Sequence, residues 1–190
     1  MLIDTERGIV RLKVVYYGPA MSGKTTNLEK LASLEGLSMT KIDTAGERTL
    51  VFDFATKKVP LGKLNVSFAL YTVPGQDIYR DMRLTVLKGV DGLVFVADSS
   101  AKRLEENKRF LELLRMDLPR VGKTYGQVPI VIQYNKMDLP DALDYYLLER
   151  ELNVDRWSSV CASAIRGEGV RETFDLLEGL LLARLERLMG

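Results

Sequence analysis

The chain has 190 residues, a formal net charge of +1 and a hydrophobic content of 46%, which is enough for one domain, 1–190, with its own core. The balanced charge excludes a basic nucleic-acid-binding surface, and the apolar content excludes a disordered chain. One cysteine, Cys161, and no histidine exclude an internal disulfide, a Cys/His zinc site and a histidine base.

Short apolar runs alternate with segments of helical period from one end of the chain to the other. Strands are predicted at 10–18, 48–56, 64–72, 91–99, 128–135 and 156–163, and helices at 24–36, 101–118, 142–153 and 170–188. Pro60 and Gly62 in KKVPLGK favour a turn, so the second and third strands are predicted to form a hairpin. This order predicts an α/β fold of three layers: a six-stranded, mostly parallel sheet with one antiparallel edge strand, and helices on both faces.

The first predicted strand leads directly into GPAMSGKT, residues 18–25, and a helix follows. This is the G-x-x-x-x-G-K-[ST] pattern, whose glycines let backbone N–H groups surround phosphates at the positive end of the helix. Lys24 is predicted to reach the outer phosphates during catalysis, and the hydroxyl of Thr25 to bind Mg²⁺. The residues predicted to contact the nucleotide here are Gly18, Ala20, Met21, Ser22, Gly23, Lys24, Thr25 and Thr26. The motif alone leaves ATP and GTP open.

A second motif, NKMD, follows the predicted strand VPIVIQY. Asp138 can accept hydrogen bonds from the ring N–H and the amino group of guanine, whereas adenine offers neither, so a site of this kind discriminates strongly. The stem of Lys136 can cover the base, and Asn135 can tie neighbouring loops together. In CASAI, Ser163 and Ala164 can offer backbone N–H groups to the guanine oxygen. The two motifs together favour GTP and GDP as ligands.

These elements resemble a small Ras-like GTPase over nearly the whole chain. The strings YYGPxxSGKTTNL, ERTLxFDF, LYTVPGQ, GVDGxVFVADS, VPIVIQxNKxDLPDAL and GxGVxETF resemble the bacterial MglA family, the mutual-gliding GTPases of polarity control. The resemblance implies a P-loop GTPase fold and a GTP/GDP-dependent switch that hydrolyses GTP with Mg²⁺. It also implies a role in cell polarity and gliding or twitching motility, a homodimeric activating partner of roadblock fold (the MglB type), and polarity effectors.

Two strings compete for the switch that senses the third phosphate, DTAGE at 43–47 and TVPGQ at 72–76. Only GLSMTKI separates DTAGE from the predicted helix end at Gly36; it is not strand-like and is too short for two strands. TVPGQ instead comes directly off a predicted strand. We therefore interpret TVPGQ as the switch, in which Gly75 donates its N–H to the third phosphate and Gln76 positions water.

The segment KIDTAGERTL then lies where switch I belongs, and one of its hydroxyls must reach magnesium. Thr40, Thr44 and Thr49 all qualify by composition. The resemblance implies Thr49 as the magnesium and GTP ligand. It also implies that Arg48 is an arginine finger within the same chain; a surface arginine is the competing interpretation.

Two positions depart from the usual Ras-like pattern. Thr72 stands where an aspartate normally supports magnesium, a departure shared with MglA proteins, and Asp53 is either a substitute carboxylate or a structural one. Ala20 stands where a glycine normally faces the third phosphate. We therefore expect slow intrinsic hydrolysis that a partner stimulates. A nucleotide-dependent interaction module with negligible hydrolysis stays open as the alternative, whereas NKMD disfavours a kinase or ATPase.

Neither end of the chain carries a membrane signal. MLIDTERGIV lacks the features of a secretory signal, Leu2 stands where myristoylation needs glycine, and LERLMG has no prenylation cysteine. No apolar run approaches the roughly 20 residues of a membrane span. We expect a cytoplasmic protein, monomeric by itself, that binds no nucleic acid and that only its partners recruit to a cell pole or membrane.

Overall fold

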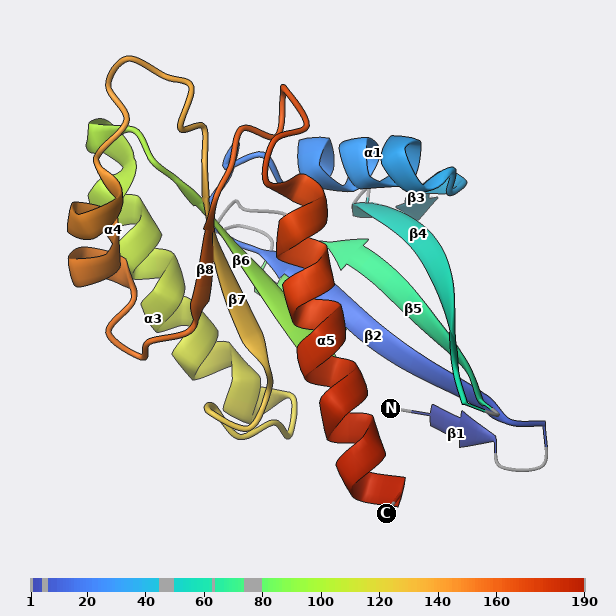
Figure 1. Cartoon of the computed structure of the whole chain (residues 1–190). Coiled ribbons are helices and arrows are strands. Elements are labelled where there is room, and N and C mark those ends of the chain that lie inside the picture. Colours follow the sequence, from blue (N-terminus) through green and yellow to red (C-terminus); the bar gives the residue numbers. More distant parts are fainter. Residues whose placement is uncertain (1, 5–6, 45–49, 63, 74–79, 190) are drawn as a thin grey trace.

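The computed structural model describes residues 2–4, 7–44, 50–62, 64–73 and 80–189; for residues 3, 41–44, 50–54 and 189 it describes the backbone only. The strands are β1 (Leu2–Asp4), β2 (Ile9–Tyr17), β3 (Met39–Thr44), β4 (Leu50–Leu61), β5 (Leu64–Thr72), β6 (Gly92–Asp98), β7 (Ile130–Asn135) and β8 (Ser158–Cys161) (Figure 1). The helices are α1 (Lys24–Glu35), α2 (Arg80–Leu87), the 3-10 turn η2 (Ala101–Arg103), α3 (Leu104–Arg120), α4 (Tyr145–Leu152) and α5 (Val170–Met189).

The strands form one sheet in the order β3-β4-β5-β2-β6-β7-β8, with β1 beside β2. Strands β5, β2, β6, β7 and β8 are parallel to their neighbours in that series, whereas β3–β4, β4–β5 and β1–β2 are antiparallel. The predicted α/β class and mostly parallel sheet are confirmed. The predicted count of six strands with one antiparallel edge strand is wrong, because seven strands lie on the path and two antiparallel pairings stand at its β3 end.

Strand β3 is the main departure from the sequence prediction, which interpreted GLSMTKI, residues 36–42, as not strand-like. Met39–Thr44 pairs antiparallel with β4, from Met39 opposite Ala55 to Thr44 opposite Leu50. The apolar residues of this segment are scattered, so its strand conformation comes from backbone pairing with a distant neighbour rather than from a local pattern. Helix α2, in a segment left without a prediction, and the short β1 were also missed.

The hairpin between β4 and β5 is tighter than predicted. Strand β4 continues through Pro60 to Leu61, which lies opposite Leu64, so Pro60 belongs to the strand and Gly62 to the turn. Beyond Ala55 no pairing joins β4 to β3, so Pro60 lies on a strand with one ladder partner and its missing N–H interrupts no second ladder. The predicted hairpin is therefore right, but its turn is shorter.

Two apolar layers hold the sheet between its helices. Along β2, alternate side chains such as Val14 and Tyr16 pack with α1 and α5, while Val15 and Tyr17 pack with α2, α3 and α4 on the other face. All four are fully buried. Figure 1 shows α1 and α5 on the near side of the sheet. The parallel strands between these layers bring the carboxyl ends of β5, β2, β6, β7 and β8 to one edge, where the loops that follow them meet.

Candidate nucleotide-binding site

The loop between β2 and α1 turns sharply at two glycines. Gly18 has φ +143° and Gly23 has φ +99°, values that side-chain-bearing residues rarely adopt. A Cβ on Gly18 would collide with the Val96 carbonyl oxygen, and one on Gly23 would collide with Asn135 Nδ2. Helix α1 starts at Lys24 with no side-chain cap and no acidic residue in its first turn. Its first N–H groups therefore remain available for an anionic ligand.

Lys24 occupies the centre of this loop. Its side chain is buried, and Nζ donates to the carbonyl oxygens of Gly18 at 3.0 Å and Pro19 at 2.5 Å. Burial lowers the pKa of Lys24 to about 7. An ammonium has three donors, so one remains for a phosphate oxygen, and a phosphate would favour the charged form. The predicted phosphate role of Lys24 therefore fits its position.

Asn135 joins three loops at the end of β7. Its Nδ2 donates to the Ser22 carbonyl oxygen at 2.7 Å, and its Oδ1 accepts from the Ala164 N–H at 2.8 Å. The predicted tie between loops is therefore present, and it connects segments more than 100 residues apart: 113 between Ser22 and Asn135. Asn135 itself is buried.

A cavity of about 210 Å³ opens beside these bonds. It is lined by Met21, Gly23, Thr26, Asn135, Lys136, Asp138, Leu139, Ala164 and Ile165. Seven of the nine were predicted from the sequence; Leu139 and Ile165 were missed because an apolar residue beside a motif carries no signal of its own. Ser163 lies behind this wall, and its Oγ donates to Asp138 Oδ1 at 2.7 Å.

That hydrogen bond from Ser163 is the main cause that lowers the pKa of the Asp138 carboxyl below its ordinary value. Asp138 is therefore an ionised acceptor at the cavity wall, as guanine recognition requires. Lys136 has φ +67°, an uncommon value for a residue other than glycine. Such strain at a binding loop is typical of functional sites. These observations agree with the predicted role of NKMD in holding a base.

The strand that precedes TVPGQ ends beside the phosphate loop. Strand β5 runs parallel to β2 with Thr72 opposite Tyr16, and the Val73 N–H donates to the Tyr16 carbonyl oxygen at 3.2 Å. Residues 74–79, and with them Gly75 and Gln76, lie outside the described part of the chain. The chain therefore leaves the sheet beside the phosphate loop, where the predicted switch is needed. The roles of Gly75 and Gln76 themselves stay predictions.

The other predicted switch is placed in the same way. Thr44 and Leu50, the described residues on either side of Arg48 and Thr49, are paired at the same edge of the sheet as the end of β5. Arg48 and Thr49 themselves lie outside the described residues. Asp53 lies on β4 opposite Lys41, and only its backbone is described.

The donor set fits a nucleoside triphosphate with Mg²⁺. The glycine cradle, the uncapped start of α1 and buried Lys24 provide positive charge and N–H donors for phosphates. Among the described residues, no group of three or more His, Cys, Asp or Glu could hold a metal by itself. Mg²⁺ is commonly held by one or two protein ligands together with phosphates, and exposed Thr25 in the first turn of α1 suits that arrangement.

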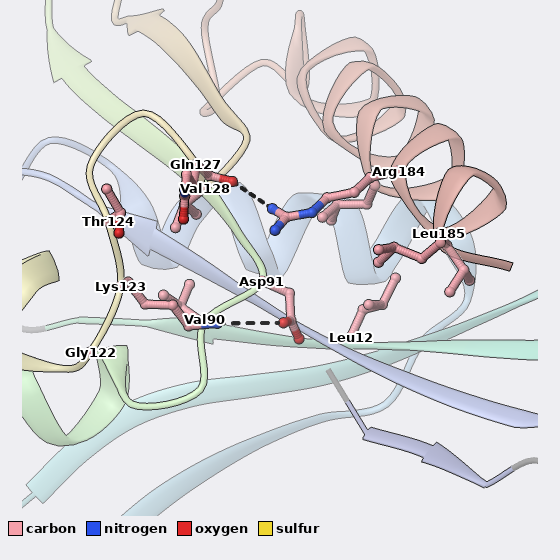
Figure 2. A pocket seen from close by; sticks show the side chains of 12 residues that line it. Leu12, Val90, Asp91, Gly122, Lys123, Thr124, Gln127, Val128, Arg184 and Leu185 are labelled. Atoms are coloured by element: carbon pink, nitrogen blue, oxygen red, sulfur yellow. Dashed lines mark hydrogen bonds and ion pairs between the residues drawn. The ribbon is translucent and has the colours of Figure 1, made fainter.

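A second hollow, of about 290 Å³, lies at the opposite end of the parallel strands, where β6 and β7 begin (Figure 2). It is lined by Leu12, Val90, Asp91, Gly122, Lys123, Thr124, Gln127, Val128, Leu181, Arg184, Leu185 and Leu188. Figure 2 shows Arg184 pointing to the Gln127 carbonyl oxygen, to which its Nη1 donates at 2.5 Å. No residue predicted to bind nucleotide lines this hollow. In the described residues, no helix has the length and apolarity to cross a bilayer.

Comparisons with known proteins agree with this geometry. The model of the "ADP-ribosylation factor family" matches residues 5–180. The mutual gliding-motility protein MglA of Myxococcus xanthus is 41% identical over 185 residues, which is 94% of this chain and 94% of that protein. ADP-ribosylation factor-like protein 4D of Homo sapiens is 32% identical over 187 residues, 94% of this chain and 87% of that protein. ADP-ribosylation factor-like protein 4A of Homo sapiens is 31% identical over 183 residues, 92% and 86%.

Proposed function

The chain belongs to the ADP-ribosylation factor family of small GTPases, and from this premise we propose how its own residues bind and hydrolyse GTP. It is a GTPase that converts GTP to GDP and phosphate and acts as a molecular switch. The alternative, a module that binds nucleotide without hydrolysing it, is not favoured, because the chain matches the GTPase family over residues 5–180.

The Asn135 bridge is the observation that supports this assignment of the site most directly. It joins the phosphate loop at the Ser22 carbonyl oxygen to the Ala164 N–H of the base-binding side. The guanine base occupies the cavity beside it, where Asp138 accepts from the ring N–H and the amino group. The stem of Lys136 covers one face of the base, and the Ala164 region offers N–H groups to the guanine oxygen.

The phosphates lie in the cradle between Gly18 and the start of α1. Lys24 donates to the outer phosphates, and backbone N–H groups from Gly18 to Thr26 surround the inner ones. Thr25 and Thr49 hold Mg²⁺, which neutralises charge on the phosphates when bound. These residues bind and orient the triphosphate before any bond is broken.

Hydrolysis needs a positioned water and compensation of the charge that develops on the transferred phosphoryl group. Gln76 positions the water, the Gly75 N–H contacts the third phosphate, and Arg48 supplies a guanidinium worth about 10³–10⁵ in rate. Ala20 adds bulk beside the third phosphate, so intrinsic hydrolysis is slow until the switch segments are correctly arranged.

Calorimetry and single-turnover hydrolysis test this assignment. The wild-type chain binds GDP and not ADP, and Arg48→Ala and Gln76→Ala each hydrolyse bound GTP at least about 10-fold more slowly. Arg7→Ala is the matched control, because Arg7 is exposed and pairs with Asp4, three residues before it. Equal binding of GDP and ADP would refute the base assignment. Wild-type hydrolysis rates in both switch variants would refute the roles of Arg48 and Gln76.

A role in polarity and motility follows from the relative named mutual gliding-motility protein MglA. The chain acts in the cytoplasm, where partner proteins recruit it to a pole or membrane. A homodimeric roadblock-fold protein of the MglB type stimulates hydrolysis, and polarity effectors bind the GTP form; no nucleic acid is involved. Phosphate release with and without such a homodimer tests this: an unchanged rate removes the proposed activator and leaves the GTPase assignment intact.

A further inference from the structure

We propose that Asp98 is a positioning residue that couples the base-binding loop to the phosphate loop, by holding Lys136 on one side and Arg103 on the other. The inference rests on the proposed function of the site, since it assigns a role within that site. Neither Asp98 nor Arg103 belongs to the motifs that predicted the site. Asp98 is the last residue of β6 and Arg103 is the last residue of η2, so both stand in the chain between the two nucleotide-binding loops.

The carboxylate of Asp98 is fixed from its own side of the structure. It is the last residue of β6 and is only 3% exposed. Its Oδ1 accepts from the Ser100 N–H at 3.1 Å and from Ser100 Oγ at 2.7 Å. The Asp98 backbone is held by buried Asn107, which accepts from the Asp98 N–H at 3.0 Å and donates to its carbonyl oxygen at 2.7 Å. The position of Oδ2 is therefore set by α3 and by the turn, independently of any nucleotide.

Oδ2 faces a cation from the base-binding loop. Lys136 Nζ donates to it at 2.6 Å, a short charge-assisted hydrogen bond. Lys136 lines the cavity beside Asn135 and has a left-handed backbone, so the bond fixes a side chain whose backbone is already strained. The same bond fixes the far end of a side chain that lines the cavity.

Oδ2 also faces a cation that holds the phosphate loop. Arg103 Nη2 donates to the Ala20 carbonyl oxygen at 2.6 Å, while its Nε lies 3.9 Å from Asp98 Oδ2. Its Nη1 forms an ion pair with Glu106. Arg103 thus reaches 83 residues back in the chain to the one position of the phosphate loop where alanine replaces the usual glycine. One carboxylate oxygen therefore lies between the two loops.

The charge of Asp98 is maintained despite its burial. Burial by itself would raise the pKa of this carboxyl, but the hydrogen bonds from Lys136 and Ser100 outweigh it and lower the pKa below its ordinary value. Because the charge persists, removing one cation leaves Asp98 paired with the other. Removing both leaves a buried carboxylate without a counter-charge, which is far more costly than either single loss. This unequal cost is a measurable signature of coupling.

A double-mutant cycle on GDP release tests the proposal. The rate of release of a fluorescent GDP analogue is measured for Lys136→Met, Arg103→Met and the double variant, first with Asp98 present and then in an Asp98→Asn background. We expect each single variant to release GDP several-fold faster, and the double variant to exceed the product of the two single effects at least about threefold. In the Asp98→Asn background the two effects multiply, because the shared charge is absent.

Two control variants separate coupling from local stability. Lys102→Met removes an exposed cation from the same turn and leaves the release rate within twofold of wild type. Ser100→Ala removes the hydroxyl contact to Oδ1, leaves the backbone N–H contact, and lowers thermal stability, but it keeps the non-multiplicative behaviour of Lys136 and Arg103. If Asp98 only capped the turn, the effects of Lys136→Met and Arg103→Met would combine in the same way in the Ser100→Ala and Asp98→Asn backgrounds.

The outcomes distinguish this inference from the proposed function. If single effects multiply within twofold while Asp98 is present, the coupling is refuted, although GDP binding by the wild type would still support the nucleotide site. If the wild-type chain releases no GDP because it binds none, both the site and the coupling are refuted. The coupling is supported if the double variant exceeds the product of the two single effects on GDP release when Asp98 is present, and equals that product in the Asp98→Asn background.

Discussion

Hollows lie at both ends of the parallel strands, and the one at the carboxyl ends has walls that a single side chain links across three loops. At the carboxyl edge, a cavity of about 210 Å³ is bounded by backbone that Asn135 ties across three loops. At the amino edge, a hollow of about 290 Å³ is bounded mainly by leucines of α5 and by the loop before β7 (Figure 2). There the polar links include the Arg184–Gln127 bond, the Lys13 N–H that donates to Asp91 Oδ2 at 2.8 Å, and the loose Lys123–Asp91 pair at 3.9 Å.

The difference lies in the backbone rather than in the volume. Met21, Gly23 and Lys136, all at the smaller cavity, have positive φ angles, so strained backbone is concentrated where N–H and C=O groups converge. Of the residues that line the larger hollow, only Gly122 has a positive φ. Parallel strands bring several chain segments to the carboxyl edge, which explains why the assembled site stands there. A choice by cavity volume alone would have selected the hollow at the amino ends of the strands.

The largest effect is expected from Gly23→Ala. A left-handed φ costs a residue with a Cβ about 1–2 kcal/mol, and the new Cβ would also collide with Asn135 Nδ2. Both the phosphate loop and the three-loop bridge should then be displaced, lowering GDP affinity by about 100-fold or more, equivalent to about 2.7 kcal/mol. Calorimetry measures the loss. Gly36→Ala, also at positive φ but with no atom within 4 Å of its Cβ, is the control that should keep GDP affinity.

Asp138→Asn should alter base choice more than fold. The carboxylate that accepts two guanine donors becomes an amide, so GDP affinity should fall roughly 30-fold, about the 2 kcal/mol of a hydrogen bond to a charged group, while affinity for xanthosine diphosphate rises. Competition against a labelled nucleotide measures both changes. Asp141→Asn, an exposed acid close by in the same loop, should change neither. An Asp138→Asn protein that still prefers guanine would place the base elsewhere.

The buried lysine predicts a smaller, pH-dependent effect. Below about pH 7 Lys24 is already charged, so phosphate binding needs no proton, whereas at higher pH binding must protonate it. GDP affinity should therefore be full below about pH 7 and fall as pH rises, by up to about tenfold per unit, with proton uptake on binding. Calorimetry at pH 8 in buffers of different ionisation heat counts those protons. Exposed Lys58→Met should leave the uptake unchanged; no uptake in wild type would contradict the role of Lys24.

The amino-edge hollow should affect stability alone. Leu185 is buried there, and Leu185→Ala should cost about 3 kcal/mol of unfolding free energy through the cavity it leaves. Arg184→Ala, on an exposed side chain, should cost less than about 1 kcal/mol. GDP affinity of the folded protein should change less than twofold in both. Urea unfolding measures the stability and calorimetry measures the GDP affinity. A large loss of affinity in either variant would contradict the claim that this hollow affects stability alone.

The sequence predicted those parts of the molecule whose physics is local. The phosphate loop and NKMD were predicted to follow strands, and they stand at the ends of β2 and β7; glycines at 18 and 23 and a motif after a buried strand need no distant neighbour to be recognised. The helices of α1, α3, α4 and α5 were found from their apolar period, with bounds shifted by a few residues. The roles of Arg48, Thr49, Gly75 and Gln76 stay predictions, since those residues lie outside the described ones.

Only the tertiary structure decided which distant segments meet. Strand β3 exists because β4 offers it a ladder, and Pro60 is part of a strand because one side of β4 has no partner there. Asp98 serves Lys136, 38 residues further on, and its neighbour Arg103 serves Ala20, 83 residues back. A lone aspartate or arginine has no period or spacing from which such pairing could be read. Local backbone conformation can be predicted from short sequence motifs, whereas the pairing of charges depends on which strands lie side by side in the fold.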